Sequence, residues 1–456
     1  MSGLLEDTIA AVSTAPGRAG IALIRMSGPS AVEIGARVGA SAATSRSARV
    51  ATIRHPDGRP LDRALVTRFE APASFTGEDT IEICTHGGTL VPALVLDALC
   101  AAGARVAERG EFTRRAFLNG KLDLIQVEAT LDLIDSGSEA HHRAALWQLD
   151  GALSRRIQAL RESLLHVRAL VGYDIDFPGE DDGPLPRELI LAAASGLARD
   201  LESLVRHAPE GERLREGALV VLAGAPNSGK SSIFNHLLGS QRAIVTDVPG
   251  TTRDAIEVAT SIDGFPFRIV DTAGVRAAPE PIERLGIEVA RRFLSHADVV
   301  LLCVEAQRPP TVADRELAEE VLALGARVIA VRTKCDLSEG AGAAPQDVSP
   351  WGSAVTVSAK TGEGMEDLRE ALLESGFAGL RRADEPALVT RGRQTRALRE
   401  AADEVDSFRR LLDEHHPAEI ASAHLESAAV ALDSVVGLAD IDDVLGAIFA
   451  TFCVGK

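Results

Sequence analysis

A glycine-rich segment that contains a lysine and two serines carries the strongest chemical signal in the sequence. It reads Gly-Ala-Pro-Asn-Ser-Gly-Lys-Ser over residues 224–231 and follows an apolar run that begins at Ala218. The segment fits the pattern G-x-x-x-x-G-K-[ST], in which backbone N–H groups cradle phosphates. Lys230 would reach the outer phosphates and Ser231 would ligate Mg²⁺. The strand-loop-helix context favours a nucleotide-binding loop over an ordinary glycine-rich turn.

Three further segments follow apolar runs in the order expected of a GTP-binding domain. Asp271-Thr272-Ala273-Gly274 offers a carboxylate for the Mg²⁺ shell and a glycine N–H for the terminal phosphate. Thr333-Lys334-Cys335-Asp336 and Ser358-Ala359-Lys360 fall where the base would be read. Asp336 would accept two hydrogen bonds from guanine, a pattern that adenine does not offer. The four segments together predict GTP rather than ATP.

The apolar runs also predict the elements that position these residues. Runs at 218–223, 267–270, 299–304, 328–331 and 355–357 alternate with helical sequence, which is typical of a doubly wound parallel sheet. Short strand-like runs such as 21–26 and 79–84 predict an α+β domain near the N-terminus, whereas Leu, Ile and Val at helical spacing predict long helices elsewhere. We therefore expect an N-terminal α+β domain (1–120), a helical domain in two parts (121–216 and 377–456) and an inserted doubly wound P-loop G domain (217–376).

Composition narrows the class of protein. The chain has 456 residues, of which 46% are hydrophobic and 25% charged, as in globular proteins. No apolar run approaches a membrane span and the first residues lack a signal-peptide pattern, so we expect a cytoplasmic location and no membrane. The net charge of −18 argues against a general nucleic-acid coat, although residues 1–121 hold 14 Lys or Arg against 12 Asp or Glu. Five widely spaced cysteines suggest reduced thiols.

The motifs as a set resemble the MnmE (TrmE) family of tRNA-modifying GTPases. The resemblance to translation-factor-class GTPases lies in the segments above and in Gly250-Thr251-Thr252-Arg253-Asp254. The flanking motifs are specific to this one family. They are Asp7-Thr8-Ile9-Ala10, Pro16-Gly17-Arg18, Ser74-Phe75-Thr76-Gly77-Glu78-Asp79, His86-Gly87-Gly88, Gly110-Glu111-Phe112-Thr113, Leu118-Asn119-Gly120-Lys121-Leu122-Asp123-Leu124 and Phe452-Cys453-Val454-Gly455-Lys456.

The resemblance implies an activity in tRNA modification. It implies a homodimer that acts with the FAD-containing protein MnmG (GidA) to form a (carboxymethyl)aminomethyl group on the wobble uridine of certain tRNAs. The one-carbon unit would come from formyltetrahydrofolate bound by Arg25, Glu82, Lys121 and Lys456, whose charges suit glutamate carboxylates and pterin N–H groups. Cys453 becomes a catalytic candidate, whereas without the resemblance a lone cysteine is more often a small buried thiol.

Hydrolysis of GTP needs a group other than the usual glutamine, because Val275 follows Gly274. The resemblance implies a potassium ion held by Asn227, Thr246, Val248 and Thr251, Mg²⁺ held by Ser231 and Thr252, and a water oriented by Glu283. An isolated Glu would otherwise be taken as a solvated helix residue. The expected GTP-binding set is Asn227, Ser228, Gly229, Lys230, Ser231, Ser232, Thr246, Asp247, Val248, Pro249, Gly250, Thr251, Thr252, Asp271, Thr272, Ala273, Gly274, Thr333, Lys334, Asp336, Ser358, Ala359 and Lys360.

One departure from the family pattern and two alternative functions remain. Thr333 stands where the family usually has Asn, and its hydroxyl offers fewer hydrogen bonds than an amide, which predicts weaker guanine affinity. The main alternative function is a GTPase switch in ribosome or RNA assembly that performs no chemistry itself, and a nucleotide-gated scaffold is a third. The pairing of the N-terminal domain with residues 453–456 favours the enzyme.

Overall fold

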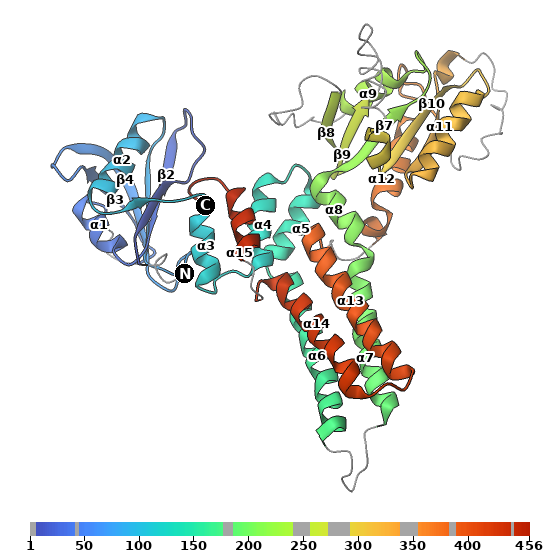
Figure 1. Cartoon of the computed structure of the whole chain (residues 1–456). Helices are drawn as coiled ribbons and strands as arrows, with labels where there is room; N and C mark the ends of the chain where they lie inside the picture. Colours follow the sequence, from blue (N-terminus) through green and yellow to red (C-terminus); the bar gives the residue numbers. More distant parts are fainter. Residues whose placement is uncertain are drawn as a thin grey trace. The chain divides into compact units, whose positions relative to one another are not determined.

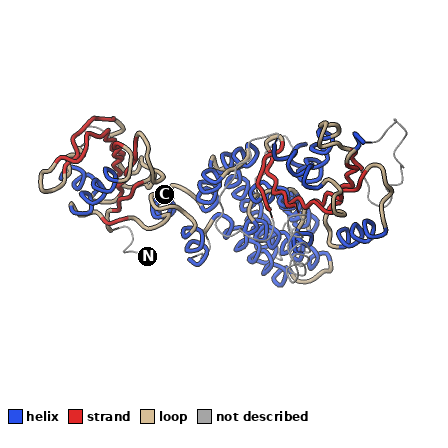
Figure 2. Tube along the Cα trace, turned by 90° about the horizontal axis from the view of Figure 1, so that it is seen from above, coloured by secondary structure: helices blue, strands red, loops and turns tan. Residues whose placement is uncertain are grey.

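The computed structural model describes residues 6–41, 45–176, 186–239, 256–271, 292–337, 354–382, 389–438 and 442–456. The chain divides into two compact units. The first unit comprises Met1–Leu131, Leu149–Gln158 and Val430–Lys456, and the second comprises Asp132–Gln148 and Ala159–Ala429. Figure 2 shows the strands of each unit (red) with helices (blue) beside them.

The N-terminal part of the first unit is a six-stranded sheet with strand order β3-β4-β5-β2-β1-β6. Its pairs are antiparallel except β1 with β6. Alternate residues of β2 and β5, among them Ile24, Met26, Ile81 and Ile83, point into a core that also contains residues of α1 and α2. The predicted strands at 21–26 and 79–84 are β2 and β5. The strands are β1 (Ile9–Val12), β2 (Ile21–Ser27), β3 (Ala48–Arg54), β4 (Pro60–Phe69), β5 (Thr80–His86) and β6 (Arg105–Val106).

Helices from both ends of the chain complete the first unit. The cluster of Leu124, Val127, Leu445, Phe449 and Phe452 packs α4 against α15 and the segment that follows it. This packing brings the C-terminal residues to the N-terminal part of the chain (Figure 1). The helices are α1 (Ala31–Arg37), α2 (Leu90–Ala101), α3 (Glu111–Leu118), α4 (Leu124–Asp135) and α15 (Asp442–Ala450).

Long amphipathic helices form the bundle. In α7 the buried residues Ile190, Ala194, Leu197 and Leu201 recur at helical spacing, which gives one apolar face to pack against α13. The stretches predicted as helical thus fold as several helices, and the predicted break at 176–184 lies almost wholly outside the described residues. The helices of the bundle are α5 (Glu139–Leu149), α6 (Ala152–Asp176), α7 (Arg187–Arg206), α8 (Ala208–Glu216), α13 (Gly392–Asp413) and α14 (Ala418–Val436).

The G domain contains a six-stranded sheet with strand order β12-β11-β10-β7-β9-β8. The predicted parallel sheet is confirmed, with one addition: β8 runs antiparallel to β9 at the edge. Figure 1 shows β7, β9 and β10 with α9, α11 and α12. The elements are β7 (Ala218–Ala223), α9 (Lys230–Gly239), β8 (Ile256–Ile262), β9 (Phe265–Asp271), β10 (Val299–Glu305), α11 (Val312–Ala323), β11 (Arg327–Thr333), the 3₁₀ turn η3 (Cys335–Leu337), β12 (Ala354–Thr356) and α12 (Met365–Arg382).

A kink interrupts α12 at Phe377. Phe377 has φ −142°, which is not helical, and its ring packs 4.9 Å from Phe265 and 5.4 Å from Phe267 between ring centroids. The kink does not establish the boundary predicted at residue 376, because Phe377 and Leu380 beyond it still pack with the core of the G-domain sheet. The division into four segments as a whole stays a prediction.

Candidate functional site

The glycine-rich loop joins β7 to α9, as the motif requires. Asn227 has φ +59°, a left-handed conformation that closes the loop. The ammonium of Lys230 folds over the loop and donates to the carbonyl oxygens of Gly224 (3.1 Å) and Ala225 (2.8 Å). Gly224 has no room for a side chain, because a Cβ would collide with the carbonyl oxygen of Cys303. The loop backbone and the lysine therefore lie together at the start of a helix, the end of a helix that favours anions.

Two of the three groups expected around Mg²⁺ meet in the structure. The hydroxyl of Ser231, at the start of α9, donates to the carboxylate of Asp271 at the end of β9 over 2.7 Å. Asp271 is nearly buried, and hydroxyl and carboxylate oxygens are ligands that Mg²⁺ prefers. This donor set fits Mg²⁺, which would neutralise charge on bound phosphates.

The base-reading segments also converge. Ser358 donates to Oδ1 of Asp336 over 2.6 Å, so the loop after β12 holds the carboxylate that would read guanine. Lys334 has φ +59° and pairs with Glu305 over 2.6 Å. Ala359 lies beside Ser358 with its carbonyl oxygen 3.2 Å from Nδ1 of His236, and Lys360 is exposed.

Thr333 has a different partner from the one that the motif suggests. Its hydroxyl donates to the carbonyl oxygen of Ser228 over 2.7 Å, and both residues are almost completely buried. Gly229 packs against the same threonine. Thr333 thus ties the base-reading segment to the phosphate loop, a contact that the sequence did not indicate.

Burial makes the thiol of Cys303, next to the phosphate loop, less acidic. Cys303 is fully buried in β10, and burial raises its pKa to about 12, with Lys230 acting in the opposite direction and Asp271 in the same direction. A thiol that stays protonated is a packing group rather than a nucleophile.

Several predicted GTP-site residues lie outside the described residues, so their expected roles stay predictions. They are Thr246, Asp247, Val248, Pro249, Gly250, Thr251, Thr252, Thr272, Ala273, Gly274 and Glu283. Ser232 is described and begins the exposed face of α9.

A second polar cluster lies on the N-terminal sheet. Arg25 and Glu82 are directly paired on β2 and β5, and Nε and Nη2 of the arginine donate to the same carboxylate oxygen over 2.9 and 2.7 Å. The guanidinium also lies 5.3 Å from the ring centre of Phe75 and 5.8 Å from that of Phe112. The pair is partly buried, with side chains 15% and 23% exposed, unlike solvated surface charges.

The C-terminal residues reach the same cluster. Val454 forms a β-bridge with Arg109, and Ser13 donates to the carbonyl oxygen of Gly455 over 2.9 Å. Burial lowers the pKa of Lys456, as does nearby Arg25, whereas Cys453 and Glu82 raise it. The charges of both Arg25 and Glu82 therefore act on Lys456.

The other two predicted residues lie at the edge of this cluster. Lys121 donates to the carbonyl oxygen of Pro72 over 3.1 Å and packs on Gly77, and so holds the loop that carries Phe75. Cys453 is exposed, so the alternative of a small buried thiol is wrong. All five cysteines are free.

A buried ionic network centred on Arg115 was not indicated by the sequence. Arg115, which is 1% exposed, binds Asp7 at 2.5 Å, Glu78 at 3.2 Å and Glu111 at 3.1 Å. Glu78 also accepts from Ser27 over 2.7 Å. The i,i+4 spacing of Glu111 and Arg115 was a visible signal, but the distant partners were not. The network fixes the loop of residues 72–79 against β2.

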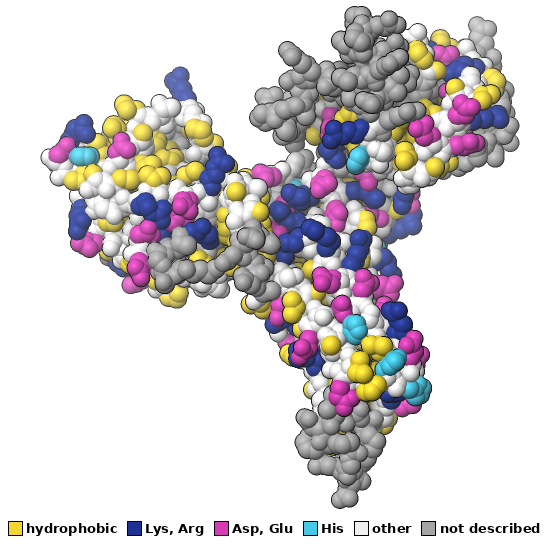
Figure 3. All heavy atoms as spheres, viewed as in Figure 1, with side chains coloured by type: hydrophobic (Ala, Val, Ile, Leu, Met, Phe, Trp, Pro, Cys, Tyr) yellow, Lys and Arg dark blue, Asp and Glu magenta, His cyan; other side chains and the backbone are white. Residues whose placement is uncertain are grey.

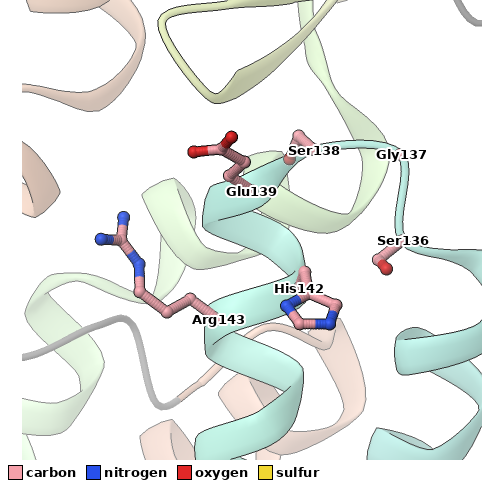
Figure 4. A pocket seen from close by; sticks show the side chains of 6 residues that line it. All are labelled: Ser136, Gly137, Ser138, Glu139, His142 and Arg143. Atoms are coloured by element: carbon pink, nitrogen blue, oxygen red, sulfur yellow. The ribbon is translucent and has the colours of Figure 1, made fainter.

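A separate hollow of about 490 Å³ lies at the start of α5. Figure 4 shows Ser136 and Ser138 in the preceding loop, with Glu139, His142 and Arg143 on the first turns of the helix. None of these residues belongs to a predicted site. Over the described residues, no group of three or more His, Cys, Asp or Glu could hold a metal ion, and no helix could cross a membrane.

Comparisons with known proteins agree along the whole chain. A family model described as the MnmE helical domain matches residues 124–453, and one described as the GTP-binding protein TrmE N-terminus matches residues 8–121. The tRNA modification GTPase MnmE of Neisseria meningitidis serogroup A is 42% identical over 98% of this chain and 99% of its own. That of Ectopseudomonas mendocina is 40% identical over 99% of both. The G domain of the T. maritima FeoB iron transporter is 29% identical over 35% of this chain and 98% of its own, with a TM-score of 0.28.

Proposed function

The chain belongs to the MnmE (TrmE) family, and we propose on that basis that it is a GTPase that acts in the modification of tRNA. The observation that carries the proposed GTPase activity is the hydrogen bond between Ser231 and Asp271. It lies at the end of the phosphate loop, where Lys230 contacts the carbonyl oxygen of Gly224. The Ser358–Asp336 contact supports guanine as the base.

Mg²⁺ and potassium would bind in the same nucleotide site. Ser231 and Thr252 would hold Mg²⁺, which neutralises charge on the outer phosphates. Asn227, Thr246, Val248 and Thr251 would hold potassium, which offsets charge that develops between the phosphates. Glu283 would orient the attacking water.

The proposed role in tRNA modification rests on the polar cluster around Arg25. We infer a reduced folate there, held by Arg25, Glu82, Lys121 and Lys456, with formyltetrahydrofolate as the one-carbon carrier. The fit is chemical: a partly buried carboxylate can accept from pterin N–H groups, while cations suit the glutamate tail. Cys453, exposed beside Lys456, would act in the chemical step.

An apolar row on the N-terminal sheet supports a homodimer. The register aligns Val50, Leu65, Cys84 and Leu23 across four strands on the face opposite the core, and Val50 and Leu65 are 58% and 43% exposed. Figure 3 shows hydrophobic side chains gathered over this part of the molecule. Such a face favours a protein partner.

The remaining assignments come from family membership. We propose the FAD-containing MnmG (GidA) protein and tRNA as partners, the cytoplasm as the location, and the domain division 1–120, 121–216, 217–376 and 377–456.

The test is mass spectrometry of tRNA nucleosides from a strain that lacks the gene and carries either the wild type or a variant. Cys453→Ser is expected to abolish the modified wobble uridine while GTP turnover of the purified protein stays near wild type. Cys100→Ser, in partly buried α2 of the same unit, is the matched control and should keep both activities. A deletion strain with unchanged nucleosides would contradict the tRNA-modifying function and favour the non-modifying switch.

A further inference from the structure

Helix α8 joins the helical bundle to the G domain. Four of its five charged residues contact these two parts in alternation along the helix. It follows α7 directly and leads through Gly217 into β7, the strand that ends at the phosphate loop. At about 100° per residue, Glu210 and Arg213 lie within about 60° of each other, as do Glu212 and Arg215, and the two pairs face nearly opposite directions. Figure 1 shows α8 between α7 and the sheet of the G domain.

The first pair is fastened to the sheet of the G domain and to α12. Arg213 pairs with Oδ1 of Asp298 over 2.7 Å, and Oδ2 of the same carboxylate accepts from the backbone N–H of Leu219 over 2.8 Å. One carboxylate therefore ties α8 to the beginning of β7 and to the residue before β10. Glu210 accepts from the N–H groups of Gly379 (3.1 Å) and Leu380 (2.7 Å), just after the kink in α12.

The second pair is fastened to the bundle. Asp132, at the end of α4, has a side chain that is 4% exposed and lies 3.3 Å from Arg215. The same carboxylate binds Arg391, at the start of α13, over 2.6 and 3.2 Å. Glu212 accepts from the hydroxyl of Thr395 in the first turns of α13.

We propose that α8 is a rigid link that couples the nucleotide state of the G domain to the start of α13 in the bundle. A shift of β7 acts on Arg213 through Asp298, and α8 passes the shift to Asp132 and Arg391 through Arg215. Movement of α8 relative to either the G domain or the bundle would separate a partly buried ion pair. A carboxylate would then lose one of its partners, which is costly. The helix therefore moves with both sides or not at all. The coupling rests on the proposed GTP binding.

The experiment is hydrogen–deuterium exchange of the full-length protein, free and with GDP or a non-hydrolysable GTP analogue. Wild type is expected to change its exchange at residues 389–401 when nucleotide binds, because local opening there is linked to the G domain. Glu212→Gln/Arg215→Gln should reduce that change at least threefold while nucleotide affinity stays within twofold. Arg213→Gln, which breaks the ion pair with the G domain, should give the same loss.

Controls separate coupling from folding and from binding. Arg168→Gln removes a bundle arginine paired with Glu426, away from α8, and should keep the wild-type response. If the double variant does not fold by circular dichroism, Arg215→Lys keeps the charge and loses the planar fork, and it should show a partial loss. An undiminished response in the variants, or no response in wild type that binds nucleotide, overturns the link. Failure of wild type to bind nucleotide would instead refute the proposed function, and the affinity measurement alone would reveal it.

Discussion

The hydroxyl of Thr333 offers a sharp test of how the phosphate loop is held. Thr333→Val keeps the shape of the side chain and removes the donor to the Ser228 carbonyl oxygen, 2.7 Å away and nearly inaccessible to water. A buried acceptor left without its partner costs about 1–3 kcal/mol. Without nucleotide the loop can relax until water reaches this carbonyl, whereas bound phosphates hold the loop in place. We therefore expect the cost to fall on the bound state and to weaken GDP binding by about 5–150-fold.

The assay is equilibrium titration with a fluorescent GDP analogue at fixed Mg²⁺. Thr333→Ser keeps the hydroxyl, loses only a methyl group and should bind within about twofold of wild type. Equal affinities for the valine variant and the wild type would refute the reasoning. A fall in thermal stability without a change in affinity would show that the hydrogen bond supports folding alone.

Three further predictions follow from the two sites and the bundle. GTP turnover should be faster in KCl than in NaCl at equal concentration, and Glu283→Ala should lower turnover far more than nucleotide affinity; equal rates in both salts would exclude the potassium site. Arg25→Gln should weaken formyltetrahydrofolate binding by about 10–100-fold in calorimetry, since a charged hydrogen bond is worth about 1.5–3 kcal/mol, and unchanged affinity would contradict the folate site. Burial lowers the pKa of His141, as do Arg215 and Arg391, while Asp132 and Asp135 raise it. Because the unfolded chain takes up a proton near pH 6.5 and the folded chain does so only at lower pH, the free energy of unfolding should fall as pH drops from 7.5 to 5.5. His141→Gln should flatten this dependence in urea titrations, and an identical slope would refute it.

The G domain could be predicted from the sequence because its signals are local. Apolar runs of buried parallel strands precede each motif, and parallel strands bring their carboxyl ends to one edge of the sheet. The contacts of Ser231 with Asp271 and of Asp336 with Ser358 follow from that arrangement. The edge strand β8 was missed because its sequence, Ile256–Ile262, mixes apolar and polar residues and lacks a continuous apolar run.

Long-range polar contacts could not be predicted in the same way. Two of the three partners of Arg115 come from positions 37 and 108 residues away along the chain, and nothing in the spacing of charges selects them. The same holds for Asp132 and Arg391, which are 259 residues apart. Such pairs depend on how helices pack, and that packing is specified by many apolar residues together rather than by the charged residues themselves.

The position of the C-terminal tail depends on backbone geometry that its sequence motif alone does not reveal. A sequence that ends in Cys-Val-Gly-Lys carries no periodicity that would dock it, yet two glycines explain why it docks at the N-terminal sheet. Gly455 has φ +95°, and a Cβ there would lie 2.5 Å from the carbonyl oxygen of Val12. Gly110 has φ +66°, and a Cβ there would lie 2.9 Å from the ring of Phe449. Both positions need the absence of a side chain for the tail to approach, and the docked tail places Lys456 where the charges of Arg25 and Glu82 act on it.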